Sequence, residues 1–597
     1  MTALLDRRRW PEILGHDLLG TVGARRVAAA LLVALLPAAC GSGDGTPVAQ
    51  QAMAQNGADG GGRSLVGNYL AGRHAQSRRD ISAAADFLGA ALEKDPGNRD
   101  LLHSVFLLSA IEGRIADALG LARRVIRRGG DTPIANLVLV VDDMKNGRFD
   151  AAGRRLEKTS TTGINAFMRP LMRAWALVGM ERVDDGLDAL RPLIGKSGYK
   201  AMYDLHAALI NGRTGRLEAA ENHYTSAASG GLSLRIVELL GALYRQTGRL
   251  REAEALYEKY QSAHPTSQLL EASMARLRAK SGAKRLIASA ADGAAEVMFG
   301  VASFLRTQNA RETALIFGHL ALYLKPDFPL IQILMADILE SENRLENANA
   351  IYETIARGSE FSWSARLRVA GNLDRLDRHE EAMSQLRALA DEDPANAEPF
   401  INLGDILRRR ERYTEAVDAY GQSVARIGKL ERRHWSLLYS RGIALERAKN
   451  WPAAEADFLK ALELEPNQPH VLNYLGYSWV DQGQNLDKAR QMIETAVKLR
   501  PNDGYIVDSL GWALYRMGDH EKATRELERA VELRPEDPII NDHLGDAYWK
   551  VGRRAEARFQ WHRALSLEPE PELVAGIQAK IERGMAEKPE VSRDGKD

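Results

Sequence analysis

Prolines recur in the C-terminal part of the chain at a nearly constant interval. Pro466, Pro501, Pro535 and Pro569 are 35, 34 and 34 residues apart. Internal periods of about 20 to 50 residues are typical of repeat proteins, whose units stack on their neighbours. At 597 residues the chain is also too long for one ordinary hydrophobic core. The period therefore predicts a stack of repeated units.

Small residues follow the same period. A glycine lies ten residues after each of the first three prolines, and two alanines, seven residues apart, follow each glycine with a bulky residue between them. The alanines and the bulky residue fall at i, i+4 and i+7, which is one face of a helix. Each unit is predicted to be a hairpin of two helices, ended by its proline. These small residues are Gly476, Gly511, Gly545, Ala489, Ala523 and Ala557.

The recurring glycine needs a physical reason, because glycine inside a helix costs about 1 kcal/mol relative to alanine. A missing side chain lets the second helix approach closely, so we interpret the glycines as packing positions. The alternative, a glycine in a chemical site, is disfavoured because the next residue is Tyr477, Trp512 or Asp546. Other units place equivalent packing glycines at Gly241, Gly404 and Gly442.

The period and pattern resemble the tetratricopeptide repeat, in which W-x2-L-G-x2-Y, A-x3-F and a proline follow one another within about 34 residues. Counted by phase, about fourteen such units cover about 500 residues. The resemblance implies an all-α, right-handed superhelical solenoid of helical hairpins, with no reaction centre.

Shifts in phase and composition divide the chain. The insert between the first two arrays is either a hinge or a decayed repeat, and we favour decay. In chain order we expect a leader and signal peptide (1–40), a flexible tether (41–64), an N-terminal array (65–267), a helical insert (268–294), a middle array (295–430), a C-terminal array (435–571), a capping helix (572–587) and a disordered tail (588–597).

Cys40, the one cysteine, closes a segment that reads as a secretory signal. Two arginines precede an apolar run of thirteen residues, whereas a membrane-spanning helix needs about twenty. Small residues before Cys40 resemble the lipobox of bacterial lipoproteins, which implies lipidation, and Gly41 resembles outer-membrane sorting. Pro37 replaces the usual leucine of the lipobox, so plain cleaved secretion and an uncleaved anchor remain alternatives to lipidation. Whether residues 1–23 are translated is a separate open question.

The sequence offers no convincing catalytic, cofactor or metal motif. Lys+Arg and Asp+Glu both number 80, which argues against a chain-wide field for binding nucleic acid or an anionic membrane. A single cysteine excludes a disulfide framework, and the histidines show no metal-ligand spacing. We therefore predict no enzyme, no cofactor and no metal. Asp142 and Asp143 are expected to be solvated, and His206, His319 and His543 to be surface or partly buried residues.

A curved stack of hairpins presents the first helices of its units on a concave face, which suits an extended peptide or a partner protein. Aromatic and charged residues cluster at these positions in the last units, and such residues carry binding energy at interfaces. Packing between repeats is the alternative role for each of them. The candidate residues are Asn473, Tyr477, Asp508, Trp512, Tyr515, Arg516, Asp542, Asp546, Trp549 and Lys550.

The run from Leu472 to Arg558 resembles a more particular family of Gram-negative outer-membrane lipoproteins. It carries the insertion QGQNLDKA, then DSLGWALYRMG and HLGDAYWKVGRRAEAR. One member type is an adaptor for a periplasmic carboxyl-terminal processing protease. The resemblance implies a lipid-anchored scaffold on the periplasmic face of the outer membrane that presents cell-wall hydrolases to that protease. A scaffold for polysaccharide secretion or outer-membrane assembly is the alternative, and soluble periplasm is the alternative location.

Overall fold

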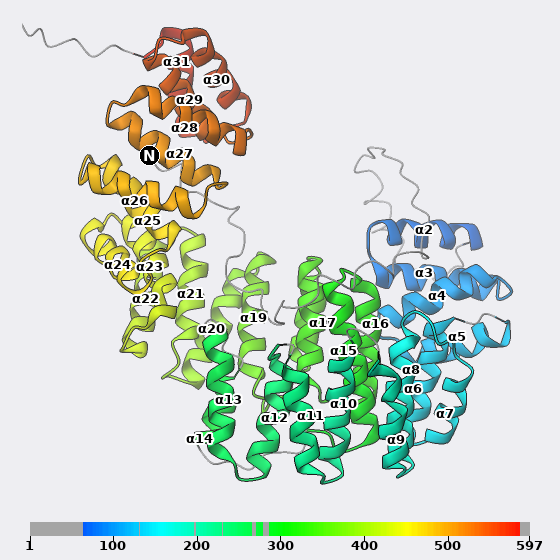
Figure 1. Ribbon diagram of the computed structural model, residues 1–597. Coiled ribbons are helices and arrows are strands. Elements are labelled where there is room, and N and C mark those ends of the chain that lie inside the picture. Colours follow the sequence, from blue (N-terminus) through cyan, green and yellow to red (C-terminus); the bar gives the residue numbers. More distant parts are fainter. Residues whose placement is uncertain are drawn as a thin grey trace, which may run out of the picture. The chain divides into compact units, whose positions relative to one another are not determined.

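The computed structural model describes residues 64–129, 132–195, 199–229, 231–264, 270–278 and 286–585. Within these ranges every regular element is a helix (Figure 1). Cys40, the predicted signal and tether up to residue 63, and the predicted tail 588–597 lie outside the described residues. The described chain divides into two compact units, an N-terminal unit of residues 64–376 and a C-terminal unit of residues 377–585.

The N-terminal unit begins with α2 and ends with α19. Its helices are α2 (Leu65–Ser77), α3 (Ile81–Lys94), α4 (Arg99–Ile111), α5 (Ile115–Arg127), α6 (Pro133–Lys145), α7 (Phe149–Glu157), α8 (Asn165–Gly179), α9 (Val183–Ala189), η3 (Arg191–Leu193), α10 (Lys200–Arg213), α11 (Leu217–Ala228), α12 (Leu234–Gln246), α13 (Leu250–Ala263), α14 (Glu271–Arg278), α15 (Ala290–Thr307), α16 (Arg311–Leu324), α17 (Pro329–Ser341), α18 (Leu345–Glu353) and α19 (Ser362–Arg375).

The C-terminal unit begins with α20 and ends with α31. Apart from α14, α19, α20 and α31, the described α-helices follow one another within the two units as thirteen pairs. The helices of this unit are α20 (His379–Glu392), α21 (Glu398–Arg409), α22 (Tyr413–Ile427), η4 (Arg432–His434), α23 (Trp435–Arg447), α24 (Trp451–Leu464), α25 (Pro469–Asp481), α26 (Leu486–Leu499), α27 (Gly504–Arg516), α28 (His520–Leu533), α29 (Pro538–Lys550), α30 (Arg554–Ser566) and α31 (Pro571–Arg583).

Local sequence sets the ends of these helices, as α27, α28 and α29 illustrate. Gly518 adopts φ +87°, a left-handed conformation that ends α27 at little cost because glycine has no Cβ. The Asp519 carboxylate then accepts from the N–H of Lys522 and caps α28. Asp537 caps α29 in the same way, with Pro538 at its first position. Successive helices are thereby forced to reverse direction within a few residues.

The periodic glycines lie where the two helices of a pair are closest. A Cβ built on Gly511 would lie 2.5 Å from Leu527 Cγ, and one on Gly545 would lie 2.4 Å from Trp561 Nε1. The glycine thus faces the bulky residue that stands between the two alanines of the second helix. Gly241, Gly404, Gly442 and Gly476 face Tyr257, Tyr420, Phe458 and Ile493 in the same way.

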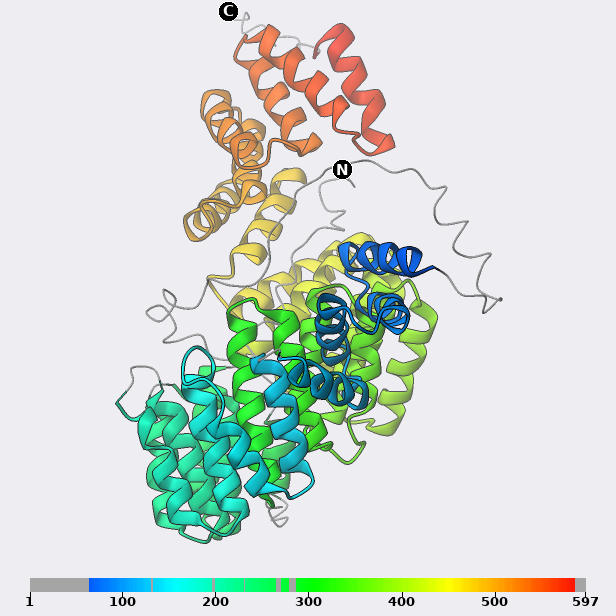
Figure 2. The ribbon, with the colours of Figure 1, turned by 90° about the vertical axis from the view of Figure 1, so that its right-hand side faces the viewer.

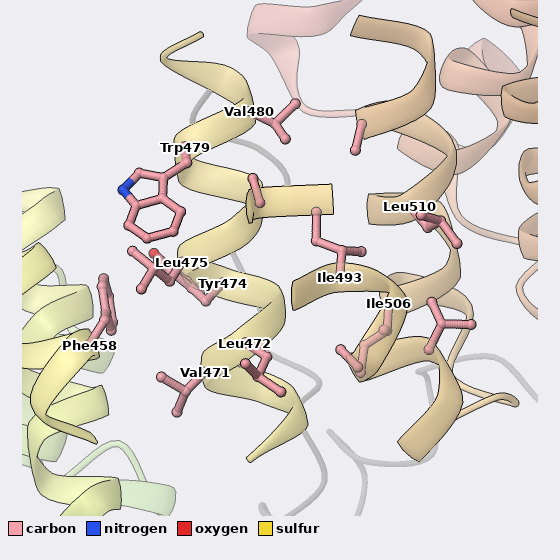
Figure 3. Packing of buried hydrophobic residues seen from close by; sticks show 14 of the residues in the cluster. Phe458, Val471, Leu472, Tyr474, Leu475, Trp479, Val480, Ile493, Ile506 and Leu510 are labelled. Atoms are coloured by element: carbon pink, nitrogen blue, oxygen red, sulfur yellow. The ribbon is translucent and has the colours of Figure 1, made fainter. Parts of the chain in front are cut away.

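One core cluster of the C-terminal unit runs from α23 to α29, and a second joins α28 to α31. Figure 3 shows Phe458 of α24 and Leu475 on one side of α25, and Ile493 of α26 on its other side, between α25 and α27. Burial of this apolar surface is the main stabilising contribution, and each pair shares it only with its neighbours.

The N-terminal unit differs, because part of the chain returns to its own first helices. Helices α15 and α16 lie beside α4, α6 and α8, as Figures 1 and 2 show in green and cyan. Gly293 of α15 packs against Trp175 of α8, where a Cβ would lie 2.2 Å from the indole. The Tyr323 hydroxyl donates to Asp142 Oδ1 at 3.0 Å. This hairpin therefore occupies the inner side of the first repeats.

Two expectations about polar residues are wrong. Asp142 and Asp143 are buried, because Arg148, from the turn that follows α6, binds both carboxylates at 2.9 Å and Arg155 of α7 reaches Asp143. His206 and His543 are also buried, each against a tryptophan of a neighbouring repeat. Sequence spacing alone does not show which partners a neighbouring helix supplies.

The region predicted as an insert, 268–294, contains α14 and the first residues of α15. The helix α15 begins at Ala290, where Ser289 and Asp292 form a capping box. The described residues divide after Leu376 instead, within the predicted middle array. Whether residues 268–294 act as a hinge stays a prediction.

Candidate protein-binding surface

Ten predicted residues of α25, α27 and α29, here called the candidate surface, lie within the C-terminal unit. They occupy equivalent places around Gly476, Gly511 and Gly545, one turn before the glycine, directly after it, and one turn further on. Asp508 and Asp546 are buried, whereas Arg516 and Lys550 are exposed. The other six are half-buried: Asn473, Tyr477, Trp512, Tyr515, Asp542 and Trp549.

One cluster of the candidate surface joins α27 to α29. Asp508 is fully buried, and its Oδ1 lies 2.9 Å from His543 Nδ1. The His543 ring stacks on Trp512 with 4.1 Å between ring centroids, and Trp512 stacks in turn on Tyr515 at 4.9 Å. His543 was not predicted as a partner of Asp508. It lies two residues before Gly545, a position of α29 that faces α27, the preceding first helix.

Electrostatics tie this cluster together. Burial alone lowers the pKa of His543, but the charge and hydrogen bond of Asp508 outweigh it, so the pKa is raised. Burial, together with the charges of Asp508 and Asp481, raises the pKa of Tyr477 well above its usual range. The Asp508 carboxylate therefore favours the protonated form of the buried His543 ring, and the Tyr477 hydroxyl beside the pair stays neutral.

A second cluster joins α29 to α31. Lys580 Nζ lies 2.8 Å from Asp542 Oδ2 and 2.7 Å from Asp546 Oδ1, and the Trp561 indole donates to Asp546 Oδ1 at 3.0 Å. Burial, together with the charge of Asp542, raises the pKa of Asp546 to about 6 against the opposing effect of Lys580. Helix α31 thus engages the carboxylates of α29 that the sequence assigned to a partner.

Trp549 is also engaged by the end of the chain. Its indole N–H donates to the backbone carbonyl of Met585 at 3.2 Å, and a Cβ on Gly584 would lie 2.1 Å from its ring. The guanidinium of Arg554 lies 3.9 Å from the ring centroid. Asp542, Asp546 and Trp549 therefore act in packing between α29 and α31, which was the alternative role considered for them.

The part of the candidate surface on α25 and α27 contains buried polar atoms that no other described group satisfies. Asn473 Oδ1, Asp508 Oδ2 and Trp512 Nε1 are buried and have no hydrogen-bond partner. Unsatisfied buried polar atoms cost about 1–3 kcal/mol each.

Comparisons with known families agree with this architecture. Residues 370–431, 401–469 and 439–504 match the family described as Tetratricopeptide repeat, as do residues 234–266 of the N-terminal unit. Residues 511–552 match the description TPR repeat. These matched segments, about a third of the chain, are similar to tetratricopeptide repeats. The predicted all-α fold of tetratricopeptide-like helical hairpins is confirmed over the described residues.

Similar tetratricopeptide proteins come from several organisms. TPR repeat-containing protein PA4667 of Pseudomonas aeruginosa is 29% identical over 181 residues, which span 30% of this chain and about 30% of that relative's length. Cut9 in the APC/C hetero-tetramer Cut9-Hcn1 is 15% identical, with a TM-score of 0.37 over 88% of this chain and 97% of that chain. Yeast Tom70 is 13% identical, with a TM-score of 0.32 over 87% and 95%.

An open hollow of about 880 Å³ lies between α22 and the pair α23–α24. Small side chains such as Gly421, Ala425 and Ala453 line it, and its Arg441 and Asp457 pair with each other at 2.6 Å. Among the described residues, no group of His, Cys, Asp or Glu has the geometry of a metal site, and no helix has the length and apolarity that a bilayer span requires.

Proposed function

We propose that this tetratricopeptide protein is a lipid-anchored scaffold of the bacterial envelope, attached through Cys40 to the periplasmic face of the outer membrane. In this role it binds a periplasmic carboxyl-terminal processing protease and presents cell-wall hydrolases to it. Tetratricopeptide repeats indicate protein–protein interaction, and the resemblance of residues 472–558 to adaptor lipoproteins supports the particular partner.

One observation carries the choice of surface. In the N-terminal unit the hairpin α15–α16 occupies the inner side of the first repeats, so those first helices already have a partner within the chain. In the C-terminal unit Tyr477 and Tyr515 are half-buried and Arg516 is exposed on the first helices. A bound polypeptide that covers aromatic and arginine side chains of this kind gains binding energy from them.

Co-purification from envelope extract tests the partner. Arg516→Glu with Lys550→Glu reverses two exposed charges of the candidate surface, and we expect it to reduce recovery of the protease. Lys522→Glu with Arg525→Glu makes the same charge change on exposed positions of α28 and should leave recovery unchanged. Recovery of secretion or assembly machinery without a protease would reject the adaptor role.

Labelling of cells with radioactive palmitate tests the anchor separately. A lipoprotein incorporates the label, and Cys40→Ser abolishes it. Incorporation that survives this substitution would reject lipidation at Cys40, whereas loss of partner recovery in the charge variants does not depend on the anchor.

A further inference from the structure

Helix α2 presents its large apolar residues outward, which reverses the usual arrangement. Its buried residues are Asn68, Gly72 and Ala75, and a Cβ on Gly72 would lie 2.6 Å from Leu88 of α3. The exposed fractions of its apolar side chains are 37% for Leu65, 63% for Val66, 43% for Tyr69 and 60% for Leu70. The contact with α3 therefore uses small residues and leaves the apolar ones uncovered.

The two ends of the described chain contrast in this respect. At the C-terminal end α31 buries Ile577 and exposes Glu572, Gln578 and Glu582. A polar outer face is what the terminal repeat of a solenoid needs in water. The apolar face of α2, at the end of the N-terminal unit in Figure 1, lacks this property. Clustered exposed apolar residues of this kind mark an interaction surface.

The charge around this apolar face indicates the kind of surface that it can bind. Helix α2 contains no acidic residue, and its second half and the turn after it carry Arg73, His74, Arg78 and Arg79. Asp80, the first acid that follows, caps α3 by accepting from the N–H of Ala83. An apolar stripe with a cationic border fits a surface that is apolar inside and anionic at its edge.

We propose that α2 lies flat on an anionic phospholipid surface. Val66 and Leu70 then enter the boundary between headgroups and acyl chains, Tyr69 lies at headgroup level, and the arginines contact lipid phosphates. A second copy of the chain fits less well, because α2 has no acidic residue to pair with the cations of another copy. This docking goes beyond the scaffold role and needs neither the candidate surface nor a lipid on Cys40.

A site-specific fluorescent label tests the docking in the full chain. In a Cys40→Ser background, Leu70→Cys is labelled with the polarity-sensitive dye NBD, and Phe559→Cys, whose native side chain is 67% exposed, is the matched control. With phosphatidylcholine–phosphatidylglycerol vesicles we expect a blue shift at position 70 and quenching by doxyl-labelled lipid, and neither effect at position 559. Arg73→Gln should weaken vesicle binding about fivefold.

Four results would overturn the proposal. A dye at position 70 that is shielded without vesicles would show that residues 1–63 cover the face. A blue shift that grows with protein concentration alone would show a second copy. Equal quenching at position 559 would show non-specific adsorption, and equal binding to pure phosphatidylcholine would remove the anionic requirement. None of these results alters partner recovery through the C-terminal unit, so the two proposals fail separately.

Discussion

At the scale of single residues, the absence of a side chain decides how closely two helices pack. Gly511 leaves room for Leu527, and an added Cβ would meet both the side chain and the backbone of that residue. Glycine lowers the intrinsic stability of α27, so close packing against α28 has to offset that cost.

Gly511→Ala should therefore destabilise the C-terminal unit by about 1–3 kcal/mol, because the methyl group overpacks the contact. Gly421→Ala is the control, since a Cβ there meets nothing within 4 Å in the helix α22. That substitution should stabilise the protein by up to about 1 kcal/mol. Urea unfolding followed by circular dichroism measures both, and a stabilising Gly511→Ala would contradict the packing role.

The pair of His543 and Asp508 makes stability depend on pH. Because the pKa of His543 is raised in the folded state, the stabilisation is present below its unfolded value of about 6.5 and is lost as pH rises through the folded value. His543→Gln should therefore destabilise the protein more at pH 6 than at pH 9, measured by thermal unfolding. An equal loss of stability at pH 6 and pH 9 would show that His543 is neutral.

At the scale of elements, the helices follow from the sequence but several of their contacts do not. The prolines and glycines predict the pairs α25–α26, α27–α28 and α29–α30 because those residues act within one unit. The contact of Tyr323 with Asp142 joins residues 181 positions apart, and no local pattern encodes it. Lys580 likewise reads as an ordinary polar residue of a capping helix until α31 is seen against Asp542 and Asp546.

The contacts of the candidate surface could likewise be predicted only in part from the sequence. The period placed its ten residues on first helices, yet it could not separate those that pack between repeats from those left unsatisfied. Asp546 and Trp549 belong to the first class, and Asn473 to the second. The difference depends on the register between successive first helices, which only the folded stack defines.

A buried ion pair fixes α15 to α12. The guanidinium of Arg235 donates from Nε to Glu296 Oε2 at 3.0 Å and from Nη1 to Glu238 at 3.0 Å. Glu296→Ala removes one of the two carboxylates that compensate the buried charge of Arg235. This substitution should lower the free energy of unfolding by about 3–5 kcal/mol. Glu415→Ala breaks an exposed pair with Arg412 and should leave the unfolding midpoint unchanged. Similar losses of stability from Glu296→Ala and Glu415→Ala would contradict a buried position of the pair between Arg235 and Glu296.

At the scale of the whole molecule, one buried histidine in each unit should make opposite contributions to the response to acid. Burial lowers the pKa of His206 to about 3, and this neutral ring accepts the hydrogen bond of the Trp175 indole at 3.1 Å. Acidification protonates His206 in the unfolded state first, so this residue lowers the stability of the N-terminal unit below pH 6.5. His543 gives the C-terminal unit the opposite trend between pH 9 and 6.

Between pH 6.5 and 5 this single histidine should lower the stability of the N-terminal unit by about 2 kcal/mol. Hydrogen exchange at the two pH values, corrected for the intrinsic rate, measures the change in helices α8 and α10. His206→Gln should abolish it, whereas a pH dependence that persists in this variant would assign the effect to another group.

The two units also differ in what they leave available to a partner. The N-terminal repeats enclose a hairpin of their own chain, whereas the first helices α25 and α27 of the C-terminal repeats keep half-buried or exposed aromatic and charged residues. Binding through the first helices of the C-terminal unit is therefore the central claim of this account.

Photo-crosslinking in cells tests that claim most directly. A photoreactive amino acid at position 516, exposed on α27, is compared with the same residue at position 525, exposed on α28. We expect a covalent adduct with a partner protein at position 516 and none at position 525. An adduct at position 525 alone would place the partner on the second helices and contradict it.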